Sequence, residues 1–142
     1  MAECGLVDQG AALIPNDSGN VLLAGGDFVQ FLGESSKLSF IFNPATQTFT
    51  ETTGSLTTPR ELSSLVAMDP AVVTGALSGQ LVTFGGVEAT SAACTPAGDI
   101  AVTTVNTAEV FNPSSQTWSA AANTMGAKKA AQATLIDRKS VV

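Results

Sequence analysis

A duplicated stretch of sequence is the feature that most constrains how this chain can fold. FNPATQTFT at positions 42–50 returns as FNPSSQTWS at 111–119, an offset of 69 residues. A second pair, SGNVLLAGG at 18–26 and SGQLVTFGG at 78–86, is offset by 60 residues, so the second copy carries nine additional residues between the two motifs. Insertions are tolerated mainly in surface loops. The chain is therefore predicted to contain two copies of one structural unit that differ in one loop.

Each copy is predicted to form four short β-strands and no helix. Short apolar segments are separated by turn sequences such as NDSG and NPATQ. Several segments, VLLA among them, are apolar at consecutive positions, which favours sheets that are covered on both faces. The expected strands are 10–15, 20–25, 38–43 and 48–52 in the first copy, 63–68, 80–85, 108–112 and 117–120 in the second, and 131–136 at the start of a third.

The duplicated motif resembles the kelch repeat of β-propellers. It has a Gly-Gly pair, then an aromatic residue, then a second aromatic residue seven positions later. The Asn-Pro turn and the basic residue before the next strand are similar to bacterial kelch proteins related to the central domain of galactose oxidase. The residues that carry the resemblance are Gly25, Gly26, Phe42 and Phe49 in the first copy and Gly85, Gly86, Phe111 and Trp118 in the second.

The resemblance implies an all-β fold, a fragment of a kelch-type β-propeller made of four-stranded antiparallel blades. Residues 1–142 would form one partial propeller, with a blade at 10–52, a blade at 63–120 and the start of a further blade at 131–142. Two blades and part of a third leave apolar faces open at both ends. Self-association, or further blades in a parent protein, is therefore expected.

The motif residues are expected to be structural. The paired glycines permit positive φ, so the chain can leave the sheet sharply. Asn43 and Asn112 are predicted to start turns by bonding to nearby backbone. Phe49 and Trp118 are predicted to pack between neighbouring blades.

Histidine and tyrosine are absent from the sequence. The copper-radical oxidases with this type of propeller use both residue types at their metal and radical, so the resemblance does not carry that activity to these residues. The lack of histidine also removes the usual general base and the commonest metal ligand. Glu109 is expected to be a solvated or edge-facing acid, and NDSGN at 16–20 a turn and not a cation loop. No catalytic residue, metal or cofactor is therefore expected.

The charge of the chain is distributed unevenly. Residues 1–127 carry eleven acids against two bases, which gives −9, and residues 128–142 carry four bases against one acid, which gives +3. An acidic body of this kind is a poor partner for nucleic acid, whose binding depends on cationic side chains. No apolar run approaches the length of a membrane span. Nucleic acid and a membrane span are therefore not expected.

Two features of the sequence give different indications of the cellular compartment. MAECGLVDQG at the start has neither a charged nor an apolar signal region, whereas the family resemblance implies an extracellular or cell-surface protein. Cys4 and Cys94 lack the spacing of a metal site. They are either unpaired or joined in a disulfide, and a disulfide would imply an oxidising compartment.

Ligand contacts are expected on the loops that follow the second and fourth strands of each copy, because these loops emerge at one face of an antiparallel four-stranded blade. The alternative for the basic residues is bonding to neighbouring carbonyls, and the alternative for the aromatic residues is packing back onto the blade. The loops are 27–37, 53–62, 87–107 and 121–130, and the candidate ligand contacts within them are Phe28, Phe31, Arg60, Asp99 and Lys129.

Three functional hypotheses follow. The first is a non-catalytic kelch-repeat module that presents loops for protein or carbohydrate recognition. The second is a scaffold fragment of a larger carbohydrate-active enzyme, similar to galactose oxidase, whose catalytic residues lie outside this chain. The third is a truncated reading frame without independent function. A longer reading frame that supplies His and Tyr would favour the second over the first.

Overall fold

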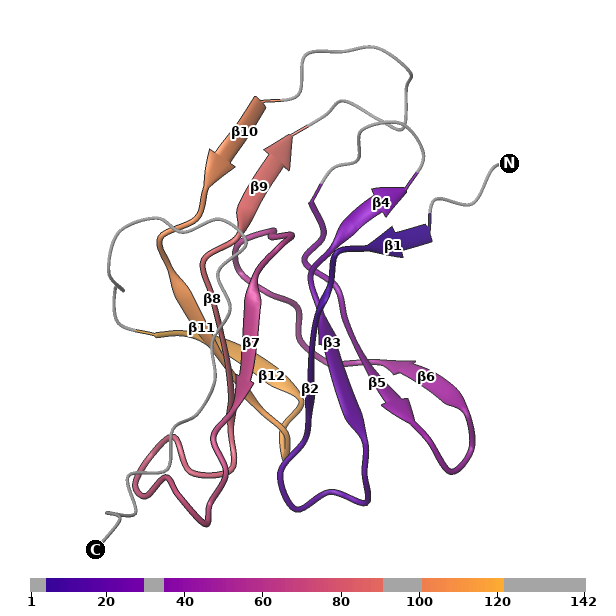
Figure 1. Cartoon of the computed structure of the whole chain (residues 1–142), viewed down its shortest axis with the longest axis vertical. Coiled ribbons are helices and arrows are strands. Elements are labelled where there is room, and N and C mark those ends of the chain that lie inside the picture. The colour runs from indigo at the N-terminus through magenta and orange to yellow at the C-terminus, as the bar shows by residue number, and fades with distance from the viewer. Residues whose placement is uncertain (1–4, 30–34, 91–100, 122–142) are drawn as a thin grey trace, which may run out of the picture.

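Two four-stranded antiparallel sheets form the body of the protein, whose computed structural model describes residues 5–29, 35–90 and 101–121 (Figure 1). The first sheet has the order β2-β3-β5-β6, and the second has the order β7-β8-β11-β12. Consecutive strands of each sheet are neighbours, so both copies of the repeat form the same meander. The strands are β2 (Gly10–Leu13), β3 (Val21–Ala24), β5 (Ser39–Asn43) and β6 (Thr48–Glu51), then β7 (Ser64–Ala67), β8 (Leu81–Phe84), β11 (Ala108–Asn112) and β12 (Thr117–Ala120).

These strands coincide with the apolar segments of the two copies, so an all-β fold with antiparallel four-stranded sheets is confirmed. We call residues 10–51 the first unit and residues 64–120 the second unit. The expected strand at 131–136 lies outside the described residues. The division into propeller blades stays a prediction.

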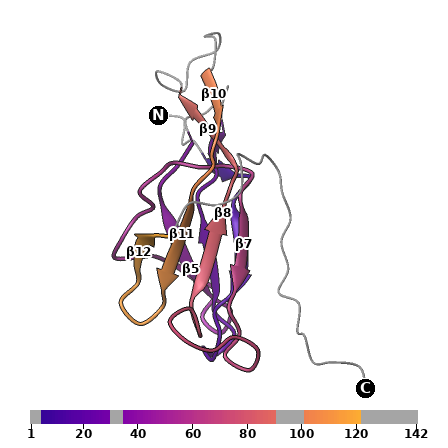
Figure 2. The same ribbon diagram turned by 90° about the vertical axis from the view of Figure 1, so that its left-hand side faces the viewer.

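Two short ribbons were not expected from the sequence. β1 (Gly5–Val7) pairs with β4 (Asp27–Val29), and β9 (Val87–Thr90) pairs with β10 (Ala101–Thr104). Both ribbons extend from the same end of the molecule, opposite the turns that join β2 to β3 and β7 to β8 (Figures 1 and 2). β4, β9 and β10 lie in segments that were expected to be loops, and β1 precedes the first expected strand. The nine additional residues of the second copy fall in the segment that contains β9 and β10.

The two sheets pack against each other through one face of each. Side chains alternate between the faces of a strand, so residues in register across the sheet share a face. In the first sheet the packed face, which we call the covering face, carries small and aliphatic side chains. In the second sheet the packed face, which we call the covered face, carries the aromatic pair. The covering face is Gly10, Ala12, Leu22, Ala24, Ser39, Ile41 and Thr50, and the covered face is Leu65, Ala67, Leu81, Thr83, Glu109, Phe111, Trp118 and Ala120.

Contacts between these two faces make the main core. Leu22 of the first sheet and Leu81 and Phe111 of the second are completely buried in one apolar cluster. Gly10 is so close to the second sheet that a Cβ there would lie 3.0 Å from the Cβ of Leu65. Trp118 belongs to the same cluster, and its Nε1 donates a hydrogen bond of 2.9 Å to Ser39 Oγ across the two sheets. Trp118 therefore packs between the units, as the sequence predicts.

Phe49 differs from its counterpart Trp118. Its side chain is 63% exposed, although it contacts Phe42 at 4.8 Å between ring centroids just as Trp118 contacts Phe111 at 5.0 Å. The expected packing of Phe49 against a neighbouring unit is absent in the described part of this chain. The physical reason is that Phe49 lies on the face of the first sheet that points away from the second.

The turns and paired glycines have the geometry that their sequences predict. Asn43 Oδ1 accepts hydrogen bonds from the backbone N–H groups of Ala45 and Thr46. Asn112 Oδ1 accepts the equivalent bonds from Ser114 and Ser115. The glycines of both Gly-Gly pairs have positive φ, at 70° and 98° in the first unit and 67° and 93° in the second. The two units are therefore alike in backbone detail as well as in strand order.

Candidate functional site

The segment that joins the two units is held by one buried ion pair. Arg60 lies in the connection between β6 and β7, and Glu109 lies on β11 of the covered face. Arg60 Nη2 is 2.7 Å from Glu109 Oε1, and the two side chains are 0% and 1% exposed. A buried charge needs both an opposite charge and further hydrogen bonds to offset the loss of water. The pair has these additional bonds.

Both members of the pair bond to backbone from the other side of the junction. The guanidinium of Arg60 donates from Nη1 to the carbonyl oxygens of Gly85 and Thr107, each at 3.1 Å. Glu109 accepts from the backbone N–H groups of Thr57 and Thr58, at 2.6 and 3.1 Å. In addition, Gly26 N–H of the first unit donates to the carbonyl of Arg60 itself at 2.8 Å. The connecting segment is thereby bonded to both sheets.

Two expectations from the sequence change at this junction. Glu109 was expected to be solvated or to face an edge, and that prediction is wrong because the side chain is buried against Arg60. Arg60 was a candidate for ligand contact, but its guanidinium points inward and bonds to carbonyl groups, which is the alternative stated for it. Sequence reasoning could not pair the two, because 49 positions separate them.

The other loop candidates are not brought together by the described structure. Phe28 lies on β4, in a part of the ribbon where only the backbone is described. Phe31, Asp99 and Lys129 lie outside the described residues. A ligand role for these four residues stays a prediction.

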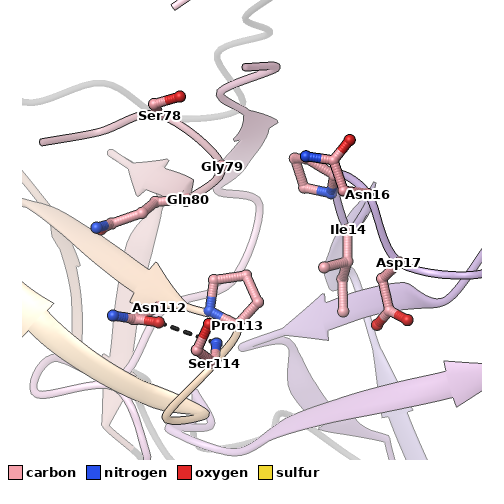
Figure 3. Close-up of a pocket in the computed structure, with 10 residues that line it drawn as sticks. Ile14, Asn16, Asp17, Ser78, Gly79, Gln80, Asn112, Pro113 and Ser114 are labelled. Atoms are coloured by element: carbon pink, nitrogen blue, oxygen red, sulfur yellow. Dashed lines mark hydrogen bonds between the residues drawn. The ribbon is translucent and has the colours of Figure 1, made fainter. Parts of the chain in front are cut away.

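A polar groove lies at the end of the molecule opposite the two ribbons, where the turns of both units meet (Figure 3). It has a volume of about 500 Å³. The turn between β2 and β3 lines one side, and the turns that precede β8 and follow β11 line the other. The residues that line it are Ile14, Pro15, Asn16, Asp17, Ser78, Gly79, Gln80, Asn112, Pro113 and Ser114.

Neutral hydrogen-bonding groups dominate the lining of the groove. The side-chain amides of Asn16 and Gln80 lie on opposite sides in Figure 3. Gln80 Nε2 donates to the carbonyl of Ala76 at 2.8 Å, which leaves its amide oxygen as an acceptor. Asp17 supplies the single charge of the lining. Pro15 and Pro113 add apolar surface. This combination suits a neutral polar ligand that both donates and accepts hydrogen bonds.

The local sequence explains the shape of the groove but did not reveal it. NDSGN at 16–20 forms the turn that was expected: Ile14 N–H donates to Asn20 O at 2.9 Å, and Asn20 Nδ2 donates to Asp17 Oδ2 at 3.0 Å. Asn16 has a φ of 57°, a left-handed conformation that Asn tolerates better than most residues. Each turn is recognisable in the sequence, whereas their meeting depends on the packing of two sheets.

The described residues contain neither a metal-binding cluster nor a helix that could cross a membrane. No group of three or more His, Cys, Asp or Glu side chains in these ranges is arranged to hold a metal ion. The whole sequence lacks His and Tyr, so the chain cannot supply the ligand set of a copper-radical site. No helix in the part that the structure describes is long and apolar enough to cross a membrane. Cys4 and Cys94 lie outside the described residues, so their pairing stays open.

Comparison with known proteins finds solved structures of similar fold but no matching family. No protein-family profile and no curated protein sequence matches it. Among solved structures, 88 chains match. One of them is a fungal alcohol oxidase of the AA5 family in complex with copper, with a TM-score of 0.62 and 13% sequence identity. The match covers 87% of this chain and 24% of the oxidase, so the fold of this chain is similar to about one quarter of that enzyme.

Proposed function

We propose that this chain is a non-catalytic segment of a kelch-type β-propeller that recognises a protein or a carbohydrate through its polar groove. The observation that carries the proposal is that turns from both units line one groove. Arg60 and Glu109 fix the connecting segment to the second unit. Bonds from Trp118 to Ser39 and from Gly26 N–H to the carbonyl of Arg60 connect the first unit, which holds the two units in a fixed relation. Binding sites gain affinity when their contact groups are positioned before the ligand arrives.

The chemistry of the lining supports a neutral ligand. Amide side chains such as those of Asn16 and Gln80 can bond to sugar hydroxyls or to the polar groups of a peptide backbone. The acidic body of the chain disfavours a polyanionic partner. Carbohydrate is therefore the ligand class that we would test first.

The test is an NMR titration of the full chain with neutral oligosaccharides. Backbone signals of the groove turns are expected to shift. Gln80→Asn is expected to weaken the binding because the shorter side chain withdraws the amide oxygen from the ligand and loses the bond to Ala76 O that holds the amide in place. Gln47→Asn is the matched control, since it makes the same change in an exposed turn outside the groove. If the shifts occurred at the ribbon end of the molecule, or if both variants behaved alike, the groove assignment would be wrong.

A second candidate is that the chain is a scaffold segment of a larger oxidase-like protein. It is favoured by the likeness to part of the fungal oxidase and by the exposed aromatic ring of Phe49 on one sheet face. Extension of the reading frame in both directions tests it. Further repeat units with His and Tyr would support this candidate, and a frame bounded by stop codons at both ends would exclude it.

A further inference from the structure

One face of the first sheet, which we call the open face, carries a row of apolar side chains that the described residues leave largely uncovered. Leu13 and Phe49 are 62% and 63% exposed, and Phe42 and Val21 between them are half-buried. Registers across the sheet place all of these residues on one side. The face consists of Ala11, Leu13, Val21, Leu23, Phe40, Phe42, Phe49 and Glu51.

The second unit shows what covers such a face. Val21, Phe42 and Phe49 correspond in the repeat to Leu81, Phe111 and Trp118, and this second set is buried by the covering face of the first unit. The aromatic pair of the open face already has the spacing of its buried counterpart. Exposed apolar surface of this kind commonly marks an interaction site. The open face is therefore complementary to a neighbour whose packed surface carries small and aliphatic side chains like those of the covering face.

Two differences between the open and covered faces define that neighbour further. Phe40 stands where the covered face has Glu109, and Phe49 stands where it has Trp118. Phe40 cannot accept a hydrogen bond from a guanidinium, and Phe49 cannot donate one to a hydroxyl as Trp118 does to Ser39. An arginine buried against Phe40 would thus lack the carboxylate that a buried charge requires.

Glu51 does not replace the missing carboxylate. It lies across from Phe40 on the edge strand β6 and is exposed. Its counterpart in the second unit is Ala120, which stays exposed although the first unit covers that face. A neighbour docked in the same way would therefore leave Glu51 in solvent.

We propose that the open face binds one further four-stranded unit of the same repeat, and that this unit carries an uncharged residue at the position of Arg60. This proposal goes beyond recognition at the groove, because the open face is the side of the first sheet that points away from the second sheet. A second copy of the chain cannot supply the covering face of its own first unit, since its second unit already occupies that face. The corresponding face of the second unit is not free either, because Val82, Ala108 and Val110 on it are buried, so the neighbour is a unit beyond these two.

The first experiment locates the exposed apolar surface on the full chain. Binding of an apolar fluorescent dye is expected to fall strongly in the double variant Leu13→Lys/Phe49→Lys. Val102→Lys is the matched control, because Val102 is an exposed apolar residue on β10, away from the open face, at 52% exposure. Circular dichroism checks that each variant keeps its strands. Equal loss of dye signal in the control and the double variant would overturn the proposal.

The second experiment supplies the missing neighbour. Residues 1–62 are fused directly ahead of residues 9–142, which places a duplicate first unit in the natural repeat register before the open face. The fusion is made with arginine at position 60 of the duplicate and, separately, with Arg60→Leu in the duplicate alone. Both fusions also carry Leu13→Lys and Phe49→Lys in the duplicate, because the duplicate would otherwise present an open face of its own. The leucine fusion is then expected to be monomeric, to bind less dye than the parent chain and to unfold at higher urea than the arginine fusion.

A charge exchange completes this test. When Phe40→Glu is introduced in the following unit of both fusions, the arginine fusion is expected to become the more stable of the two. The proposal is overturned if the arginine fusion is at least as stable as the leucine fusion while Phe40 is in place. It is also overturned if the leucine fusion still dimerises and Phe49→Lys in the following unit makes it monomeric, because that open face would then bind a second open face.

Discussion

The side chains of Arg60 and Glu109 fix the connecting segment against the second unit. Each makes bonds that cross the junction, from Arg60 to the carbonyls of Gly85 and Thr107 and from the amides of Thr57 and Thr58 to Glu109. Ion pairs of this kind contribute little net stability compared with an apolar replacement, but loss of one partner is costly. Their bonds set the position of the connecting segment against the second sheet.

Variants of this pair should show strong coupling. Glu109→Gln alone and Arg60→Met alone are each expected to lower the free energy of unfolding by about 3–5 kcal/mol, because each leaves an uncompensated buried charge. The double variant removes both charges, while the side-chain amide introduced at position 109 can still accept hydrogen bonds from the backbone. Its cost should be lower than the sum of the single costs, with an interaction energy of about 0.5–3 kcal/mol in urea unfolding.

The exposed acid Glu51 provides the control for these single and double variants. Glu51→Gln makes the same chemical change at a solvated position and is expected to alter stability by less than about 0.5 kcal/mol. A Glu109→Gln variant as stable as Glu51→Gln would show that the buried pair does not hold the junction.

At the scale of elements, the Gly-Gly pairs determine how closely the sheets approach the connecting segment. Gly25 and Gly86 each lie against the backbone of that segment, and a Cβ on Gly25 would meet the carbonyl oxygen of Arg60. At Gly86 a Cβ would lie 2.5 Å from the carbonyl oxygen of Glu61 and 3.1 Å from Ser63 Cβ. The glycines are needed for close approach as well as for positive φ.

A pair of alanine variants separates these two requirements. Gly75 has a φ of 85°, similar to 93° at Gly86, but no atom lies within 4 Å of the position of its Cβ. Gly75→Ala should cost about 1–2 kcal/mol for the left-handed conformation alone. Gly86→Ala should cost about 1–3 kcal/mol more, because the segment at Glu61 must move. Urea unfolding of both variants measures the difference, and equal costs would show that close approach at Gly86 is unimportant.

At the scale of the whole molecule, two like units present different surfaces. The turn end carries the groove, the ribbon end carries β1, β4, β9 and β10, and the first sheet has the open face (Figure 1). Stability in repeat proteins depends largely on the interfaces between units. The described core has one such interface, so the protein should behave as a partial assembly and not as a closed one.

Copper binding is a property of the whole chain that can be tested directly. Without His and Tyr, the isolated protein is expected to retain no stoichiometric copper after dialysis against a weak chelator and to oxidise no galactose. Metal analysis by atomic absorption, with a known copper oxidase as the positive control, gives the answer. Copper retained at one ion per chain would show that another ligand set is present.

Local features of this protein were determined by the sequence itself. The eight main strands, the Asn43 and Asn112 turns and the positive φ of the Gly-Gly pairs all depend on residues close together in the chain, so local chemistry is enough to predict them. Repetition of the motif also indicated two equivalent units. The burial of Trp118 followed from the same comparison.

Only the tertiary structure decided the partners of residues that are far apart. Glu109 looked like a surface acid because the connecting segment, which supplies Arg60 and the amides of Thr57 and Thr58, lies about fifty positions away. Phe49 looked like a buried residue because its motif matches that of Trp118, yet burial depends on which face has a neighbour. The groove likewise requires turns from both units. Long-range contacts of this kind depend on the relative placement of two sheets, which no local pattern specifies.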